Sequence, residues 1–438
     1  MIKEWFKQGV DGRSLLLIFA AVFLFFSTSL FIQARSIIIH PETSDFSAYF
    51  SAYIIRAELG EGIYEQERFF SLEASESVTA GVREYLYSPL FADVLSVFMP
   101  TDYTQARLWW LVIEHLSIFL LFVLSGLILR KAVGASKVGA FMVSALLIVS
   151  FSAIERSFHY GQASAVVALL LFFAAYLHAL GRTYTATFFA AFGAILKVYP
   201  IIYLVALIIK GHFREAAVMV FFMVLIVAAS MALFGVYDWA QFLGFHSSNP
   251  LVDRETGMAG GAVALLYEIP NYAPTALLFL LSDQMGWGWT QTAIWEVVRV
   301  AVLVVALGIY TLLWRRIYGS FGFLQTVALG LIGVMLISPL LWNHVFIMFI
   351  PIYAILMYRS VVDPDCSFGS FLWLLVSFGL VAFPDFMTNA GLTNHGLMVL
   401  LKYTKLYGVL ILAYFLCFSA YAQEWRQIGH GTAVEYGR

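Results

Sequence analysis

The chain is poor in charge, and this shortage says more about its class than any motif does. Of its 438 residues only 12% are charged, whereas 61% are hydrophobic and 17% are aromatic. A soluble domain carries roughly a quarter charged residues, so the surplus apolar surface must face lipid. The sequence therefore predicts a polytopic membrane protein. The net charge of −2 gives no indication of a nucleic-acid partner.

The signatures of several enzyme classes are also missing. The two cysteines, Cys366 and Cys417, lie near a short loop and in an apolar run, so a disulfide framework is not expected. No glycine-rich phosphate loop, His-Glu-x-x-His zinc motif or Gly-x-Ser-x-Gly nucleophile elbow occurs. The acidic residues of the predicted external loops are not spaced as an Asp-x-Asp metal pair. We therefore predict no cofactor, and a divalent metal ion is not indicated.

The first long apolar run, 15–33, fixes the orientation of the chain. It is too long for the core of a signal peptide and no small-residue cleavage site follows it, so we interpret it as a retained anchor. Lys3, Lys7 and Arg13 precede it, and positive charge favours the cytoplasmic side. The N-terminus is therefore predicted to be cytoplasmic.

Apolar runs and basic loops together predict about twelve spans. After the first, we place them at 107–129, 138–154, 162–180, 184–197, 199–210, 215–235, 291–314, 321–337, 344–358, 369–388 and 404–422. Short basic loops, such as the one with Arg130 and Lys131, then fall in the cytoplasm. The prediction is one all-α integral domain over 1–438 in the cell's inner (plasma) membrane, with both termini cytoplasmic.

Two external loops, 34–106 and 236–290, carry apolar segments of their own. After Asp45, the residues Phe46, Tyr49, Phe50, Tyr53 and Ile54 form one face of a helix, and Ser47, Ser51 and Arg56 lie opposite. This pattern predicts an amphipathic helix on the membrane surface with Asp45 at its start. We interpret 87–99 as a second surface or re-entrant helix, with a short span as the alternative. Pro270 and Pro274 favour surface or re-entrant helices, and not a continuous span, for 262–281 as well.

With this topology the unusual polar residues collect on the external side. They are Asp45, a short turn at 155–162, Lys197 before Pro200, and the turn at 338–344. Ionisable groups at membrane depth are candidates for function. A carboxylate beside cations suits the reaction of a hydroxyl with a lipid-linked phosphate, because the carboxylate takes a proton and the cations hold phosphate oxygens.

Each of these residues also has a purely structural interpretation. Asp45 can cap a helix, Lys197 can reach the headgroups, and Arg156 can bind lipid phosphate nonspecifically. His344 can be an ordinary interfacial histidine, and Tyr87 and Trp342 can belong to an aromatic belt.

Five short elements in order resemble glycosyltransferase family 87 of the GT-C superfamily. They are Asp45-Phe46, Tyr87-Ser88-Pro89-Leu90, Gly161-Gln162, Lys197-Val198-Tyr199-Pro200, and Ser338 through His344. The chain departs from the family pattern at Ser88, where a first proline is usual, and at Ala163-Ser164, where an asparagine is common.

The resemblance implies an inverting transferase of GT-C type that uses a polyprenyl-phosphate-linked sugar, often mannose, without a metal. We assign Asp45 as the general base on the acceptor hydroxyl. Lys197, His344 and Arg156 are assigned to the donor phosphate. The sugar or acceptor site is assigned to Tyr87, His159, Gln162, Trp342 and Asn343.

The predicted partners are the polyprenyl-phosphate sugar donor, a glycolipid or glycan acceptor, and the bilayer. The active site is expected on the external (periplasmic) face, with the 236–290 loop as the place of acceptor choice. Two alternatives stay open. A transporter or flippase would need polar residues along a path through both leaflets, which we do not find in the spans. A non-catalytic lipid-binding subunit would tolerate alanine at Asp45, Lys197 and His344.

Overall fold

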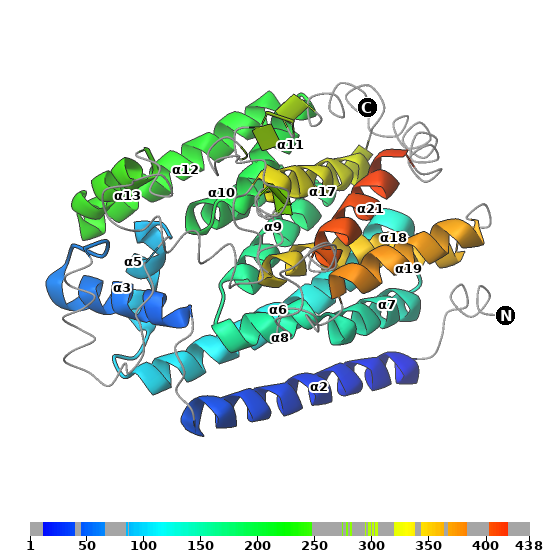
Figure 1. Ribbon diagram of the computed structural model, residues 1–438, viewed down its shortest axis with the longest axis horizontal. Helices are drawn as coiled ribbons and strands as arrows, with labels where there is room; N and C mark the ends of the chain where they lie inside the picture. The colour runs from blue at the N-terminus through cyan, green and yellow to red at the C-terminus, as the bar shows by residue number, and fades with distance from the viewer. Residues whose placement is uncertain are drawn as a thin grey trace.

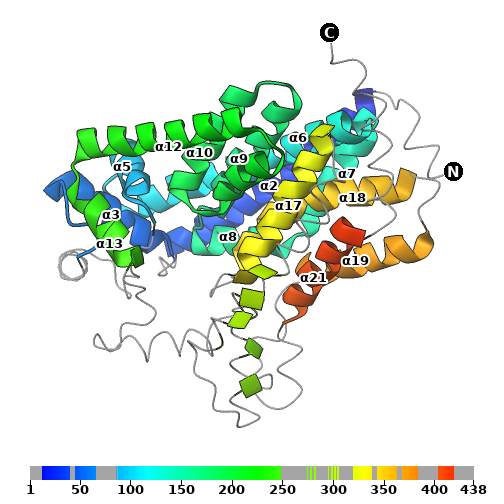
Figure 2. The same cartoon turned by 90° about the horizontal axis from the view of Figure 1, so that it is seen from above.

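The computed structural model describes residues 12–39, 45–65, 85, 87–247, 319–337, 343–362, 367–382 and 403–418, with scattered positions between 274 and 304. These residues form a bundle of helices, and none of them lies in a strand (Figures 1 and 2). The elements are α2 (Gly12–Ile39), α3 (Phe46–Leu59), α5 (Pro89–Phe98), α6 (Tyr103–Val133), α7 (Lys137–Ser150), α8 (Ser152–Tyr160), α9 (Ser164–Ala179), α10 (Thr183–Leu196), η1 (Tyr199–Ile201), α11 (Ile202–Ile209), α12 (Phe213–Phe234), α13 (Tyr237–Ser247), α17 (Gly319–Ile337), η3 (Asn343–Phe349), α18 (Ile350–Val362), α19 (Phe368–Ala382) and α21 (Thr404–Phe418).

A helix occupies the position of every predicted span except 291–314, which lies almost wholly outside the described residues. In the described part of the chain, four helices are long and apolar enough to cross a membrane, or five if the bent pair α7–α8 counts as one span. Further apolar helices of 10–17 residues accompany them. The chain is therefore an all-α membrane protein, and the total of twelve spans stays a prediction.

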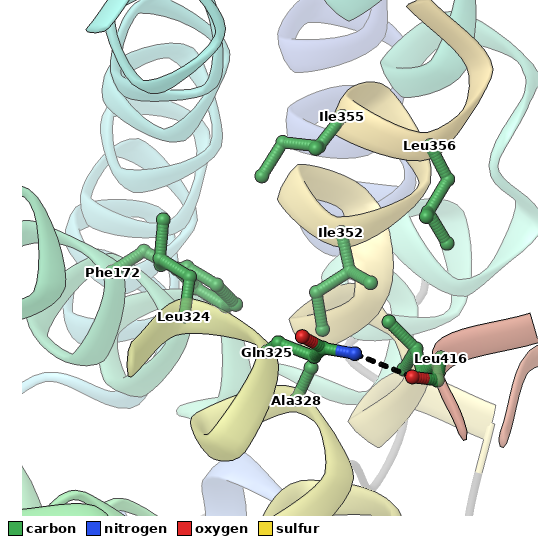
Figure 3. A pocket seen from close by; sticks show the side chains of 8 residues that line it. All are labelled: Phe172, Leu324, Gln325, Ala328, Ile352, Ile355, Leu356 and Leu416. Atoms are coloured by element: carbon green, nitrogen blue, oxygen red, sulfur yellow. Dashed lines mark hydrogen bonds between the residues drawn. The ribbon is translucent and has the colours of Figure 1, made fainter. Parts of the chain in front are cut away.

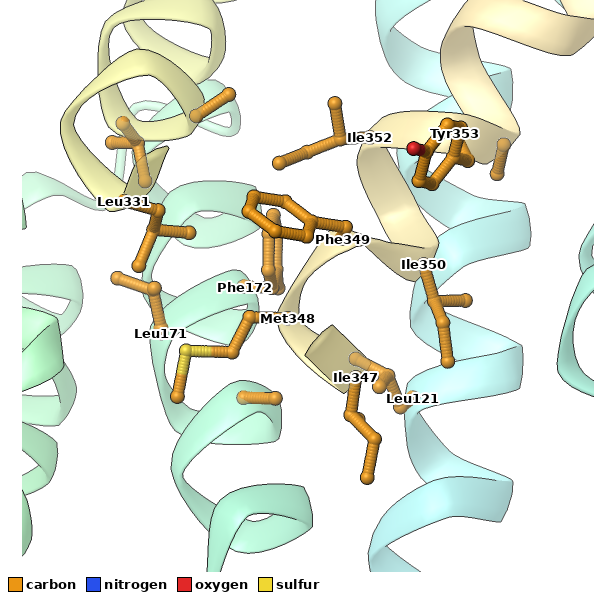
Figure 4. Close-up of a cluster of buried hydrophobic side chains, with 14 of the residues drawn as sticks. Leu121, Leu171, Phe172, Leu331, Ile347, Met348, Phe349, Ile350, Ile352 and Tyr353 are labelled. Atoms are coloured by element: carbon orange, nitrogen blue, oxygen red, sulfur yellow. The ribbon is translucent and has the colours of Figure 1, made fainter. Parts of the chain in front are cut away.

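The segment η3–α18 lies at the centre of the bundle. The most apolar stretch of this segment is 83% buried, whereas the corresponding stretches of α2 and α12 are each 11% buried. Figure 4 shows Ile347, Met348 and Phe349 of this segment among side chains of the neighbouring helices α6, α9 and α17. By contrast, α2 and α12 expose large apolar side chains such as Phe31 and Leu233, as helices in contact with lipid do.

Local sequence explains where the central helices begin and end. The Asp102 carboxylate accepts a hydrogen bond of 2.8 Å from the Gln105 N–H and so caps the start of α6. Gly134, with φ of 64°, ends this helix in the left-handed conformation that glycine adopts without strain. Ser136 caps α7 in the same way, accepting from the Gly139 N–H at 3.2 Å. Short, well-capped connections keep consecutive helices antiparallel and adjacent.

The helices α3, α5 and α13 gather at one end of the bundle, at the left of Figure 1. We call this the site end. The surface helix predicted after Asp45 is present as α3, but its polar face is not solvated. Every residue from Phe46 to Arg56 is buried, including Ser47 and Ser51. This face is covered because α5 and α6 pack on α3, and the place of the helix on the membrane surface stays a prediction.

Arg56 is tolerated at a buried position because two carboxylates neutralise it. Its guanidinium lies 2.7 Å from an oxygen of Asp93 in α5 and 2.8 Å from an oxygen of Asp238 in α13. Burial raises the pKa of Asp93 to about 6, against the opposing effects of its hydrogen bond from Ser230 and of the Arg56 charge. Asp238 also accepts the Gly62 backbone N–H at 2.9 Å. This network ties α3 and α5 to α13.

The segment 155–162, predicted as a short turn, is mostly helical. Its residues up to Tyr160 belong to the nine-residue α8, which is bent by 57° from α7. No proline or glycine interrupts the segment before Gly161, so a helix is sterically free to form. Gly161, with φ of 69°, ends α8 and turns the chain into α9. The true turn is therefore only Gly161-Gln162-Ala163.

Candidate active site

Asp45 directly precedes α3, and its carboxylate does not cap that helix. Its backbone is already helical (φ −59°, ψ −18°), and the side chain accepts no hydrogen bond from the first turn. Instead, Oδ2 accepts a hydrogen bond from Nε2 of Gln162, which lies 117 residues further along the chain. The side chain is buried, with Asp45 only 7% exposed. The capping interpretation is therefore not supported, and the carboxylate belongs to a tertiary contact.

Two tyrosines continue this contact from Gln162. The Tyr87 hydroxyl donates to Gln162 Oε1 at 3.1 Å, and the Tyr49 hydroxyl donates to the Tyr87 oxygen at 2.7 Å. Tyr49 comes from α3, and Tyr87 lies just before α5. Burial raises the pKa of Tyr87 above its ordinary value, and the Asp45 charge contributes to the rise. Both phenols are therefore neutral donors over the physiological range.

Lys197 brings a cation to the same place. Its Nζ donates to the Tyr87 hydroxyl and to Ser164 Oγ, in each case at 3.2 Å. The ammonium also lies over the rings of Tyr87, at 5.1 Å, and Tyr199, at 5.8 Å. Lys197 has extended backbone angles (φ −153°, ψ 129°) at the end of α10, three residues before a proline that cannot continue the helix.

These contacts form one directed chain of hydrogen bonds. Lys197 donates to Tyr87, Tyr87 to Gln162, and Gln162 to Asp45. Each donor polarises the next, so the chain favours the ionised carboxylate at its end. Lys197 and Asp45 also attract each other electrostatically. The arrangement holds one carboxylate as a proton acceptor and one ammonium as an anion ligand, within a single buried cluster.

The cation stands at the start of a helix. Ser164, which accepts from Lys197, is the first residue of α9. The first N–H groups of a helix have no partner within it and favour negative charge. Lys197 and this helix start therefore both favour an anion at the same position.

His344 and Asn343 open η3 and are 4% and 5% exposed. The segment η3 packs against α8 and α9, the two helices that flank the Gly161-Gln162 turn. His344 interacts electrostatically with Lys197. The structure therefore brings the predicted residues Asp45, Tyr87, Gln162, Lys197 and His344 to one place, from five separate parts of the chain.

Two predicted site residues that the structure describes take no part in these contacts, and a third is not described. Arg156 is half-buried on α8 and makes none of the hydrogen bonds of the cluster. The His159 imidazole is exposed, with its ring centroid 4.9 Å from that of Tyr160. Trp342 lies outside the described residues. Their assigned roles stay predictions.

Sequence reasoning missed four polar residues near the site. Tyr49 was assigned to an apolar helix face and Ser164 only to a departure from the family pattern, although a buried tyrosine hydroxyl generally needs a partner. Arg107 and Glu114 lie inside the first long span after the external loop, where charged residues are rare. The rarity of charged residues inside a span could have identified both Arg107 and Glu114 as candidates from the sequence.

Other parts of the described structure offer less chemistry. No group of three or more His, Cys, Asp or Glu side chains suited to a metal ion occurs among the described residues. A small pocket between α9, α17, α18 and α21 is lined by apolar side chains and by Gln325, whose Nε2 donates to the Leu416 carbonyl (Figure 3). It holds no ionisable group, so the cluster around Asp45 is the better candidate.

Comparison with known proteins shows the family of the chain. The sequence profile of glycosyltransferase family 87 matches residues 85–339, which is more than half of the chain. The match includes Tyr87, Gln162 and Lys197, whereas Asp45 and His344 lie outside it. A comparison with curated proteins gives no significant match. By the extent of the profile match, the chain belongs to glycosyltransferase family 87 and is a glycosyltransferase.

Proposed function

We propose that this glycosyltransferase moves a sugar, most simply mannose, from a polyprenyl phosphate to an acceptor hydroxyl with inversion at the anomeric carbon. The observation that carries the proposal is the chain of hydrogen bonds from Lys197 to Asp45, which is partly buried at Lys197 and Tyr87 and fully buried at Asp45. It supplies a proton acceptor and a phosphate ligand in one cluster, which are the two groups that this reaction needs. The resemblance to the GT-C superfamily supports the lipid-linked donor.

Asp45 acts as the general base. The acceptor hydroxyl oxygen attacks the anomeric carbon on the face opposite the phosphate, and its proton passes to the Asp45 carboxylate. The new bond joins the acceptor oxygen to the anomeric carbon. The bond from that carbon to the phosphate oxygen breaks, and the oxygen keeps the electron pair. Gln162 orients the carboxylate through its Nε2 hydrogen bond, so that one oxygen faces the acceptor.

Lys197 and His344 bind the leaving polyprenyl phosphate. The phosphate gains negative charge on its leaving oxygen as the bond to carbon breaks, and a fixed ammonium stabilises that charge. The start of α9 adds partial positive charge at the same position. Tyr87, His159, Gln162, Trp342 and Asn343 are assigned to the sugar or acceptor site in this proposal, and Arg156 to the donor phosphate. The prenyl chain lies in lipid between spans.

We place the site on the external (periplasmic) face of the inner membrane. This follows from the basic residues of the short loops at the other end of the spans, such as Arg130 and Lys131 after α6 and Arg182 before α10. The acceptor is proposed to be a glycolipid or a glycan, chosen by the 236–290 loop. Little of that loop beyond α13 lies within the described residues.

The test is sugar transfer by the purified protein in nanodiscs. Radiolabelled polyprenyl-phosphate mannose and polyprenyl-phosphate glucose are supplied separately, with total lipid and glycan extract as acceptors. We expect one donor to give a labelled product whose anomeric configuration, read by NMR, is opposite to that of the donor. The Asp45→Ala variant is expected to lose this product by a factor of about 10² to 10⁴, the contribution of a general base.

Asp102→Asn is the matched control. Asp102 is also an acidic residue at a helix start on the site end, but it caps α6, and asparagine caps as well as aspartate. Its activity should equal that of the wild type. Equal product from Asp45→Ala and wild type would remove Asp45 as the base. A product with retained configuration would contradict the single displacement.

A further inference from the structure

α6 carries a buried ion pair that the proposed chemistry does not use. Arg107 Nη1 and Glu114 Oε2 lie 3.5 Å apart, with side chains 4% and 0% exposed. Burying two charges costs free energy that an apolar pair would not, so a buried pair by itself is weak evidence for stability. The partners that the two residues contact beyond each other therefore need an explanation.

Those partners all belong to the end of α8 and the turn that follows it. Arg107 Nη2 donates to the carbonyls of Phe158 and His159, the latter at 3.3 Å. Glu114 Oε1 accepts the Ser157 hydroxyl at 3.0 Å. The last carbonyls of a helix lack partners within the helix, and here the guanidinium supplies them.

Two further contacts of α6 reach the residues that follow α8, Gly161 and Gln162. Trp110 lies one helical turn after Arg107, and its Nε1 donates to the Gly161 carbonyl at 2.8 Å. The Gln162 backbone N–H donates to the Ser157 carbonyl at 3.1 Å and also interacts with the Glu114 carboxylate. Polar groups of α6 therefore contact both the carbonyl and the N–H of the Gly161–Gln162 peptide.

The same residues also contact the start of α3. The Arg107 guanidinium lies 5.6 Å from the ring centroid of Phe46, the residue next to Asp45. A side chain at Gly161 would place Cβ 2.8 Å from Phe46 Cβ and 3.0 Å from Arg107 Cζ. The turn, the guanidinium and the start of α3 are therefore in close contact, with no room for a methyl group between them.

We propose that Arg107 and Glu114 are positioning residues, which fix the Gln162 carboxamide and through it the Asp45 carboxylate. The proposal rests on the proposed function in one respect, the role of Asp45 as the base. The pair does not touch the substrate. It sets the place and direction of the Gln162 side chain, and so the oxygen that Asp45 presents to the acceptor.

The test is a double-mutant cycle between Glu114→Gln and Gln162→Leu, measured as kcat for transfer at saturating donor. Glu114→Gln alone is expected to lower kcat by about tenfold to a hundredfold with KM for the donor changed less than about twofold. In the Gln162→Leu background the same change should lower kcat by less than about twofold, because the route through Gln162 is already broken. Equal losses in both backgrounds would overturn the proposal.

A gentler variant covers the case in which Glu114→Gln does not fold. Trp110→Phe removes the hydrogen bond to Gly161 and keeps an aromatic ring against Phe46, although a smaller one, and should lower kcat by a few fold. Tyr353→Phe is its control, since it deletes a buried hydroxyl that lies 2.8 Å from Ser377 Oγ, away from the site. The control should lose thermal stability without a change in kcat.

Amide hydrogen exchange separates this proposal from the proposed function, because it needs no activity. Both Glu114→Gln and Trp110→Phe should speed exchange at residues 158–163 and leave the far end of α9 unchanged. If these two variants exchange faster at 158–163 while Asp45→Ala keeps full activity, then α6 does hold the turn in place but Asp45 is not the base. Unchanged exchange at 158–163 would overturn the positioning role whatever Asp45 does.

Discussion

The two ends of α9 show two ways in which polar groups are placed in this protein. At the Ser164 end, hydrogen bonds join residues that are 110 and 117 positions apart, Tyr87 with Lys197 and Asp45 with Gln162. At the other end, His178 meets the Tyr203 hydroxyl at 3.2 Å from 25 positions away, and His212 lies 3.9 Å from Glu215, one helical turn along the chain.

The charged pair near the His178 end is also more exposed than the contact between Asp45 and Gln162. Asp45 and Gln162 are buried, at 7% and 1% exposed, whereas 43% of the His212 side chain is exposed. Polar contacts between residues that are close in sequence and near water cost little free energy to form. The chain already holds the partners together, and water forms hydrogen bonds with their remaining donors and acceptors. Contacts between distant segments in a buried place need the whole bundle around them. The site end is therefore where substitutions should affect function, and the His178 end is where they should not.

The largest effect in this comparison is expected from the two lysines. Lys197→Met removes the ammonium at the site end, and we expect kcat/KM for the donor to fall about 10² to 10³ fold, as when one fixed donor to a developing charge is lost. Lys210→Met removes a lysine at the other end and should leave kcat/KM within about twofold. Transfer assays on both variants in nanodiscs measure the difference, and similar losses would break the comparison.

Two glycines give the next contrast. Gly161 and Gly181 both have positive φ, 69° and 77°, so alanine strains the backbone of each by about 1 to 2 kcal/mol. At Gly161 the new Cβ meets Phe46 at 2.8 Å, whereas at Gly181 nothing lies within 4 Å. We expect Gly161→Ala to lower kcat about tenfold and to lower the melting temperature more than Gly181→Ala does. Equal activities would show that the turn can move away from α3.

Two tyrosines allow the two ends of α9 to be compared through the loss of one atom each, the hydroxyl oxygen. Tyr87→Phe removes the hydroxyl that links Lys197 to Gln162, and Tyr203→Phe removes the one that meets His178. Tyr87→Phe deletes three hydrogen bonds of about 1 kcal/mol each, with Tyr49, Lys197 and Gln162, whereas Tyr203→Phe deletes one, so Tyr87→Phe should also lower stability more. Only Tyr87→Phe is expected to lower kcat, by about fivefold to tenfold. Thermal unfolding and transfer rates of the two variants separate stability from function.

Most of the helices could be predicted from the sequence, and so could five candidate site residues that the structure brings together, whose roles stay predictions. Apolar runs mark helices because each must bury or face lipid along its whole length, and the element at Lys197-Val198-Tyr199-Pro200 indicated a break that α10 and η1 confirm. The site residues Asp45, Tyr87, Gln162, Lys197 and His344 came from short elements in a fixed order.

The rest could not be predicted for a physical reason. Whether the polar face of α3 meets water or α5 depends on tertiary packing, and helical periodicity is the same in both cases. Arg56 was therefore assigned to a solvated face, although it is paired with Asp93 and Asp238. Likewise, the α8 segment contains helix formers and polar residues in a short connection, and only its packing against η3 decides that it is helical.

The smallest effect is expected from His178→Phe, at the end of α9 far from the site. His178 is stacked on Phe323 at 4.1 Å, and a phenyl ring of similar size keeps this contact while it loses the bond to Tyr203. The fourteen positions between Ser164 and His178 place them about 21 Å apart along the helix, beyond the Debye length at physiological salt. We therefore expect kcat and KM within about twofold of the wild type, and unfolding free energy lower by no more than about 1 kcal/mol. A tenfold loss of kcat, measured in the same transfer assay, would mean that α9 transmits changes along its length, and that the two ends are not independent.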